Sequence, residues 1–450
     1  MGVLANVGLA TAFLGTGSLN TITNKILYQT QGVNIGGDIQ YFDRPWLNTF
    51  IMFLGELLCL IVYGIIALIM LHIPPKVDDD SDSNLTIEEK AAKKAEKNRY
   101  AFITRDEVMR NPTGGLGWKY PLYVTLFGAC DLGGTTLMGI GLTFCNASII
   151  QIVRGFVIVF TMLFAWPILH RKPNPHQLLG VMFSVIGLIV VGVSAVLNNG
   201  AGSVGSKENT IGNTILGIGL TLVGQLFSAT QFVLEEKLLK QDNGEVAPIP
   251  PLFLVGSEGL AGTILCAAIA LPVVNAIPGN DFGSYENMKN SFYMLFHNKF
   301  LLGIQFLAFM SIAFFNWCGF VYSKALSATS RTLVDALRTI IVWIVMVGVY
   351  YGTKAKYGEP ISIWSILQAG GFVFMLLGTI THNNIAGVGR KFTKCCKYPQ
   401  TENEKELYDS KEGSDSLSSN SDENEEVISL DDESSSTSIS GSSSTTISEP

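Results

Sequence analysis

Charge is scarce in this chain of 450 residues. Asp, Glu, Lys and Arg make up 15% of it, whereas soluble globular proteins carry about 25%. Apolar residues make up 48%, and the mean hydropathy is positive at +0.34. Most of the chain falls into apolar blocks of about 20 residues, which is the length that crosses a hydrocarbon core. This composition excludes a soluble enzyme.

Cysteine, histidine and nucleotide-binding motifs are also sparse. The seven cysteines show no paired spacing outside the apolar blocks, which excludes a secreted disulfide scaffold. The sequence has no Walker loop, no GxGxxG after a strand, no HExxH and no ligand-spaced Cys/His cluster. We therefore expect no cofactor, no catalytic metal and no nucleic-acid partner.

Much of the charge lies in two segments, 73–119 and 390–450. The last 50 residues hold fourteen acidic residues, two lysines and 16 serines, so residues 385–450 are expected to form a disordered, acidic, Ser-rich cytosolic tail. Segment 73–119 is expected to be a polar cytosolic insertion with a short helix near 86–100. Cys395 and Cys396 stand beside basic residues, so they are either palmitoylation sites or plain cytosolic thiols.

The hydropathy pattern predicts an all-α integral membrane protein, because lipid offers no partner to an exposed peptide group. Residues 1–72 contain spans one and two, 120–197 contain spans three to five, and 212–384 contain spans six to ten. The ten predicted spans are 3–27, 46–72, 120–143, 147–169, 176–197, 212–236, 251–272, 300–323, 327–351 and 361–384.

The distribution of basic residues predicts the orientation. If both termini are cytosolic, the cytosolic segments hold 20 Lys and Arg and the opposite segments hold 7. Loops on the cytosolic side carry an excess of Lys and Arg, so both termini are expected in the cytosol.

The two halves of the chain resemble each other. Three blocks align in the same order, at shifts of 181, 191 and 202 residues. The matched pairs are Arg154 with Asp335, Gly180 with Gly371, Gly187 with Gly378, and Glu56 with Glu258. Because five spans are an odd number, the second copy enters the membrane from the opposite side. The prediction is two inverted five-helix repeats, an architecture of secondary transporters with the substrate site between the repeats.

Charged residues inside spans are expensive and mark candidate sites. Arg154 and Asp335 lie about 11 Å from the starts of their helices, at about 1.5 Å per residue, so they can meet near the membrane midplane. One interpretation is a substrate site or a gate, and the other is a permanent pair that fixes the halves in register. Arg331 and Arg338 lie on the Asp335 face, and Gln151 extends the polar face of Arg154. The surplus positive charge favours an anionic substrate.

Three carboxylates are candidates for coupling or gating. Glu56 and Glu258 occupy matched positions of spans two and seven, and Asp131 lies in span three. Buried carboxylates can carry protons at mildly acidic pH, which suggests proton coupling. The alternative for the two glutamates is a hydrogen bond to a neighbouring helix, and for Asp131 a cap at a close helix contact.

The chain resembles the drug/metabolite transporter superfamily and, within it, solute carrier family 35, subfamily F, close to its member-six group. The resemblance covers about residues 5–390. It implies the ten-helix inverted-repeat fold, cytosolic termini and an endomembrane location such as the lysosome, vacuole or Golgi. The chain also resembles, more distantly, the chloroquine-resistance-type vacuolar transporters, although its loop 273–299 lacks their cysteines. The stretches that carry the resemblance are TGSLNTITNK (16–25), FLGELLCL (53–60), CDLGGTTLM (130–138), NASIIQIVRGFVIVFTMLF (146–164), QFVLEEKL (231–238), GSEGL (256–260), SIAFFN (311–316) and KALSATSRTLVDALRTIIVW (324–343).

These observations predict a secondary or facilitative transporter of a small metabolite. The predicted substrate-binding residues are Arg154, Asp335, Arg338 and Gln151, and the predicted coupling or gating residues are Glu56, Asp131 and Glu258. The first alternative is a non-transporting membrane scaffold that acts through its insertion and tail. A channel ranks third, and a membrane-embedded enzyme ranks last for want of a nucleophile or metal constellation.

Overall fold

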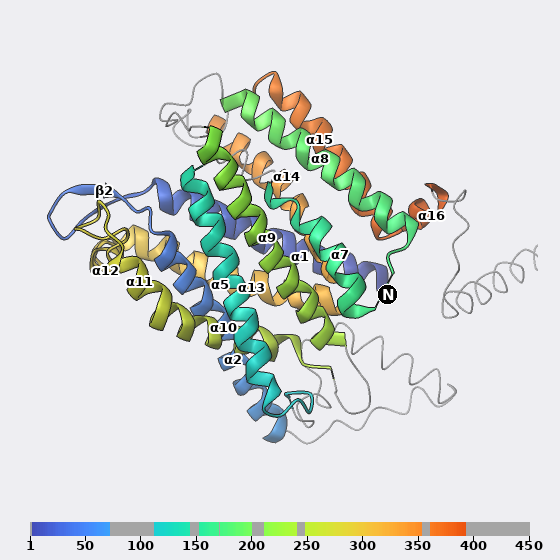
Figure 1. The fold of residues 1–450 in the computed structure, drawn as a ribbon, viewed down its shortest axis with the longest axis horizontal. Helices are drawn as coiled ribbons and strands as arrows, with labels where there is room; N and C mark the ends of the chain where they lie inside the picture. The colour runs from blue at the N-terminus through green and yellow to red at the C-terminus, as the bar shows by residue number, and fades with distance from the viewer. Residues whose placement is uncertain are drawn as a thin grey trace, which may run out of the picture. The chain divides into compact units, whose positions relative to one another are not determined.

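The computed structural model describes residues 2–72, 112–144, 153–170, 172–199, 211–240, 248–352 and 361–392. Each predicted span overlaps a helix in the described part of the chain (Figure 1). The expected helix near 86–100, the tail from 393, Cys395 and Cys396 lie outside the described residues. The helices are α1 (Gly2–Gln29), α2 (Pro45–His72), α5 (Lys119–Phe144), α7 (Val157–Leu169), α8 (Pro175–Asn199), α9 (Ile211–Lys240), α10 (Pro251–Leu265), α13 (Lys299–Ala325), α14 (Ala328–Gly352) and α15 (Trp364–His382).

The helices have the length and composition that a membrane requires. Among the described residues, seven helical runs are long and apolar enough to cross a bilayer: α2, α8, α9, α10 with its extension, α13, α14 and α15. Helices α1 and α5 have 28 and 26 residues but are not among the seven, and α7 has 13 residues. The chain is therefore mostly helical and crosses the membrane several times.

Two features depart from the predicted pattern. The span predicted at 251–272 runs to Ala276, because α10 continues through a π-helical turn (Cys266–Ala270) into α11 (Leu271–Ala276). The all-α prediction is also wrong in one connection, where β1 (Gln31–Val33) pairs antiparallel with β2 (Ile39–Tyr41). Outside the apolar spans a connection can satisfy its backbone groups as a hairpin, and Gly37 allows the turn with a φ of 91°.

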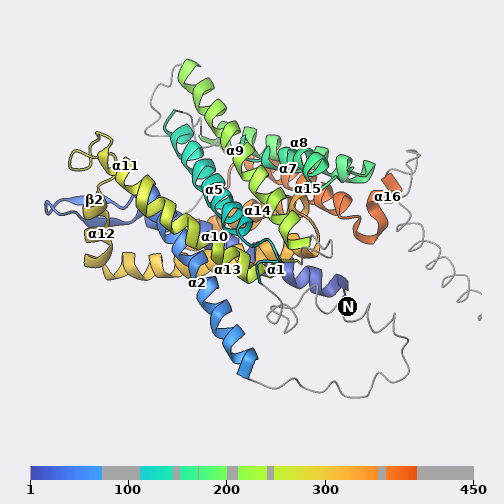
Figure 2. The same ribbon diagram turned by 60° about the horizontal axis from the view of Figure 1, so that its bottom comes forward.

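Small residues let helices from the two halves pack closely. Helix α8 packs along α15, and both views show the two side by side (Figure 1, Figure 2). A Cβ at Gly187 would lie 2.6 Å from the Gly371 carbonyl oxygen, and one at Gly180 would lie 2.7 Å from that of Gly378. Such close backbone approach is how membrane helices gain packing energy.

Gly378→Val is expected to lower the free energy of unfolding by about 3 kcal/mol through overpacking. A Cβ at Gly378 would lie 2.1 Å from the Ser184 Oγ and 2.6 Å from the Gly180 carbonyl oxygen. The matched control is Gly370→Val on the same helix, where a Cβ meets nothing within 4 Å. Thermal unfolding in detergent measures both variants, and an equal loss in the two would contradict the close packing.

Other cross-half contacts surround the centre of the fold. Helix α2 packs on α10, and Cβ atoms at Gly256 and Gly259 would lie within 2.5 Å of the Leu60 and Leu57 backbone nitrogens. The remaining major contacts join α1 with α13, α5 with α9, α1 with α14, α7 with α9, α5 with α10, α2 with α13, and α7 with α14. Helix α12 (Met288–His297) covers the hairpin beside α13, and η3 (Ile385–Gly387) with α16 (Val388–Phe392) follows α15.

Candidate functional site

A cavity of about 1200 Å³ lies between the helices of the two halves. It extends from Arg331 and Phe320 to Asp43, an exposed residue of the connection before α2. Gln151, the remaining predicted site residue, lies outside the described residues. The predicted site residues that line the cavity are Arg154, Asp335, Arg338, Glu56, Asp131 and Glu258.

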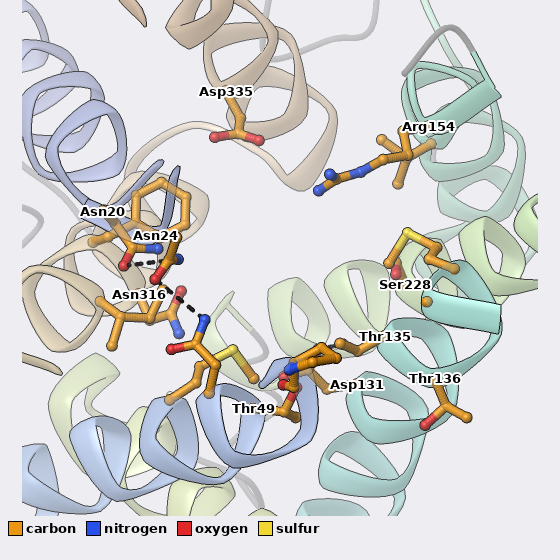
Figure 3. A pocket seen from close by; sticks show the side chains of 18 of the residues that line it. Asn20, Asn24, Thr49, Asp131, Thr135, Thr136, Arg154, Ser228, Asn316 and Asp335 are labelled. Atoms are coloured by element: carbon orange, nitrogen blue, oxygen red, sulfur yellow. Dashed lines mark hydrogen bonds between the residues drawn. The ribbon is translucent and has the colours of Figure 1, made fainter. Parts of the chain in front are cut away.

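Arg154, from the segment that precedes α7, and Asp335, from α14, project into the same open space (Figure 3). Among the described residues Arg154 has no ion-pair partner, and its side chain is exposed in the cavity. The Arg338 Nη2 donates to the Asp335 Oδ2 at 3.3 Å, while the Asp335 Oδ1 is buried without a hydrogen bond. The structure thus brings the two predicted partners to one cavity without joining them.

Arg331 does not join Asp335, although the two lie on one stripe of α14. Its Nη1 instead contacts the Glu235 Oε2 of α9 at 2.9 Å, and its guanidinium lies over the rings of Phe232 and Phe320. Sequence analysis missed Glu235 because it lies at the predicted end of span six, where a charge costs little. The signal was present, since two acidic residues adjoin within that span.

The three predicted coupling carboxylates are each held by one neutral side chain. The Asn316 amide donates to the Glu56 Oε1, and the Gln231 amide donates to the Glu258 Oε1 at 2.6 Å. Asp131 accepts from the Thr135 hydroxyl at 3.4 Å. The other Glu56 oxygen is buried and unpartnered. All three carboxylates interact electrostatically with Glu235, so they form one acidic cluster.

An amide ladder forms the wall on the α1 side of the cavity and was not predicted. Asn48 donates to the Asn24 Oδ1 at 3.2 Å and to the Tyr28 hydroxyl at 3.3 Å, and Gln305 donates to the Asn48 Oδ1 at 3.1 Å. Asn20, Asn24 and Tyr28 recur at four-residue spacing, which places them on one helix face. That spacing was the available signal.

Connections between helices cover one end of the fold, which we call the Glu286 end. Arg44 pairs with both Asp281 oxygens, and the Asn290 amide donates to the Asp281 Oδ1 at 2.7 Å. The Glu286 carboxylate accepts from the backbone N–H groups of Trp46 and Leu47, both at 3.0 Å, and so caps α2. Burial raises the pKa of Glu286 to about 7, while the two backbone donors and Arg44 limit the rise.

The opposite end, which we call the Lys240 end, is closed by contacts between α9 and the α13–α14 turn. The Lys240 Nζ lies 2.8 Å from the Glu236 Oε1 and also contacts the Leu326 carbonyl oxygen. The other Glu236 oxygen accepts from the Ala328 N–H at 2.8 Å, at the start of α14. These residues do not line the cavity, whereas Arg331 does. The cavity lining therefore stops short of the contacts that Lys240 and Glu236 make.

Comparison with known proteins identifies the family of this chain. Residues 101–193 match the model of the EamA-like transporter family. An uncharacterized protein of Schizosaccharomyces pombe is 32% identical over 272 residues, which cover 59% of this chain and 75% of that protein. Proteins named solute carrier family 35 member F6 also match more than four fifths of the chain. The chain belongs to solute carrier family 35, subfamily F, within the drug/metabolite transporter superfamily.

Members of this family also match along most of the length. Solute carrier family 35 member F6 of Rattus norvegicus is 28% identical over 411 residues, 88% of this chain and 94% of that protein. The Homo sapiens protein of the same name is 29% identical over 383 residues, 84% of this chain and 88% of that protein. Family 35 membership makes this chain a multi-pass membrane transporter of small solutes.

Among the described residues, no group of three His, Cys, Asp or Glu side chains is placed to hold a metal ion.

Proposed function

We propose that this protein moves a small metabolite across an endomembrane by alternating access, as a secondary active or facilitative transporter. The observation that carries the proposal is the charged cavity between the two halves of the fold, whose lining runs from the exposed Asp43 to the buried Arg331. All six described candidate residues line it. A lysosomal, vacuolar or Golgi membrane fits the family resemblance.

The helix contacts support two inverted five-helix repeats. If α1, α2, α5, α7 and α8 correspond in order to α9, α10, α13, α14 and α15, the major contacts exchange with one another. The contact of α1 with α13 becomes that of α9 with α5, and the contact of α1 with α14 becomes that of α9 with α7. Contacts α2–α10, α7–α14 and α8–α15 map onto themselves, as a two-fold axis requires.

Departures from this symmetry support an outward-open state. Helix α9 contacts both α13 and α14, whereas the corresponding contacts of α1 with α5 and α7 are weaker or missing in the described part of the chain. The positive-inside pattern puts the Lys240 end in the cytosol and the Glu286 end in the lumen. In this state the cavity is closed to the cytosol.

The charges in the cavity favour an anionic group on the substrate and protons as the coupling ions. Among the described residues, three arginines line the cavity; Arg331 and Arg338 are paired, which leaves the Arg154 guanidinium for a ligand. Glu56, Asp131 and Glu258 are the acidic groups that would carry protons. Arg154 and Asp335 face each other across the cavity with no ion pair between them, which supports a binding site over a permanent link between the halves.

Uptake into proteoliposomes from a mixed metabolite pool, with and without a pH gradient, tests the transporter proposal. We expect one class of solute to accumulate and to follow the gradient. Uptake that ignores the gradient would replace proton coupling with facilitated exchange. Folded protein that takes up nothing would contradict transport and favour the scaffold.

Deleting residues 401–450 separates the carrier from the scaffold. The described residues that line the cavity all fall between 13 and 339, so a carrier without residues 401–450 is expected to keep its flux within about twofold in proteoliposomes. A scaffold acting through the tail would lose its function instead. Flux that disappears with the tail, from protein that remains folded, would contradict the expectation.

A further inference from the structure

We propose that Glu235 and Arg331 form a proton-controlled latch that holds the Lys240 end closed, and that a proton reaching Glu235 through the acidic cluster opens it. This inference rests on the proposed transport function and adds the residue that connects proton binding to the change of access.

The latch is a buried ion pair between two helices of the second half, α9 and α14. Glu235 is 0% exposed and Arg331 is 5% exposed. Arg331 is confined, because it lies between the rings of Phe232 and Phe320, and a Cβ at Gly319 would lie 2.7 Å from its Nε. Removing one charge from a buried ion pair leaves the other uncompensated, which is strongly unfavourable in this conformation. The pair therefore ties closure of this end to the charge of Glu235.

Glu235 is also the carboxylate common to the whole acidic cluster. The titratable and charged groups that interact with it are Asp131 and Cys130 of α5, Glu258 of α10, Glu56 of α2 and Arg331 of α14. Of the carboxylates, Glu56, Asp131 and Glu258 line the cavity, whereas Glu235 lies behind it. A proton entering from the open end therefore meets these three first.

The number of charges explains how a proton acts at a distance from Arg331. Four carboxylates in one buried space repel one another and cannot all be ionised. With Arg331 in contact, Glu235 is the one that keeps its charge, so protons rest on the others. When a cavity-lining carboxyl group passes its proton to the Glu235 carboxylate, Arg331 loses its partner. The donor carboxylate then takes a new proton from the open end, so opening takes up one proton in all.

The position of Arg331 on α14 links protonation of Glu235 to the closed Lys240 end. Arg331 lies three residues after Ala328, whose N–H is bonded to Glu236 at the start of the helix. Release of Arg331 removes the ion pair between α9 and α14 and leaves the contacts of Glu236 and Lys240 to hold the end. Acid therefore favours opening toward the cytosol, and neutral pH favours closure.

A cysteine introduced at a buried position beside the latch tests whether the Lys240 end opens, without any substrate. Thr329 is 5% exposed in the first turn of α14. Thr329→Cys is introduced into full-length protein in which Cys145, Cys395 and Cys396 are replaced by serine, since the four described cysteines are buried. The rate of reaction with a bulky, membrane-impermeant maleimide is measured at fixed pH in detergent. We expect Glu235→Gln to raise that rate at least tenfold.

Glu258→Gln is the matched control, because it neutralises a cluster carboxylate and leaves the ion pair intact. It is expected to keep the reporter protected, and equal acceleration in the two variants would overturn the latch. A folded Glu235→Gln variant that remains protected would also overturn it. Should Glu235→Gln fail to fold, Gly319→Ala displaces Arg331 with every charge retained, and the same acceleration is expected.

The proton is tested by repeating the measurement between pH 8 and 6, with each rate divided by that of a free thiol at the same pH. The unsubstituted latch should open more at pH 6, and Glu235→Gln should be insensitive to pH. A pH-insensitive parent would overturn proton control. Missing flux in an otherwise pH-responsive protein would instead contradict transport and leave the latch standing, so the two failures are distinguishable.

Discussion

Asp335→Ala is expected to abolish flux, by at least about 100-fold, while folded protein remains in the membrane. The Asp335 carboxylate is the partner of Arg338 at 3.3 Å and faces the Arg154 guanidinium across the cavity. Without it, Arg338 loses its ion-pair partner, and two like charges face one part-buried cavity with no counter-ion between them. Uptake into proteoliposomes measures the effect, and wild-type flux would contradict a role for Asp335.

The double variant Asp335→Ala/Arg338→Ala separates substrate binding by Asp335 from simple charge compensation of Arg338. If Asp335 only neutralises Arg338, removing both charges is expected to restore most of the flux. If Asp335 contacts substrate or opens with it, the double variant stays as inactive as the single one. Thermal unfolding of both variants, compared with Gly370→Val, shows whether either result reflects lost folding.

Much of the fold could be predicted because lipid restricts a chain so strongly. A spanning segment has to be helical, so apolar length alone placed α2, α13 and α14 within a few residues of their observed ends. The same physics explains why the predicted charges share one cavity: a charge within a span cannot face lipid, so it turns inward.

The ion-pair partner of Arg331 was less predictable from the sequence. Helical spacing correctly put Arg331 and Asp335 on one stripe of α14, yet a long side chain reaches whichever charge the packing offers. That charge is Glu235, held against α14 because α9 packs there at the closed end. The hairpin at 31–41 and the amide ladder escaped prediction for another reason. Neutral side chains and short strands cost little in hydropathy, so the ladder was marked only by the four-residue spacing of Asn20, Asn24 and Tyr28.

Arg154→Gln is expected to raise the KM for an anionic substrate by about 10- to 100-fold, because a hydrogen bond to a charged group contributes about 1.5–3 kcal/mol. Arg154 is the cavity arginine without an ion-pair partner among the described residues, so its charge is available to a ligand. Arg154→Lys keeps the charge but loses the planar pair of donors, and we expect only part of the affinity to return. Initial uptake rates over a range of substrate concentrations measure all three proteins.

The control for this charge is Lys289→Gln, which removes a cation from an exposed position on α12 outside the cavity. If Arg154 merely attracts anions to the surface, both substitutions should slow uptake alike and the effect should vanish in high salt, where surface charges are screened. If Arg154 binds the anionic group, its substitution alone raises KM, and salt leaves most of the difference. An unchanged KM in Arg154→Gln would mean that the substrate carries no group for the Arg154 guanidinium, and the amide ladder on the opposite wall would then be the place to seek its recognition.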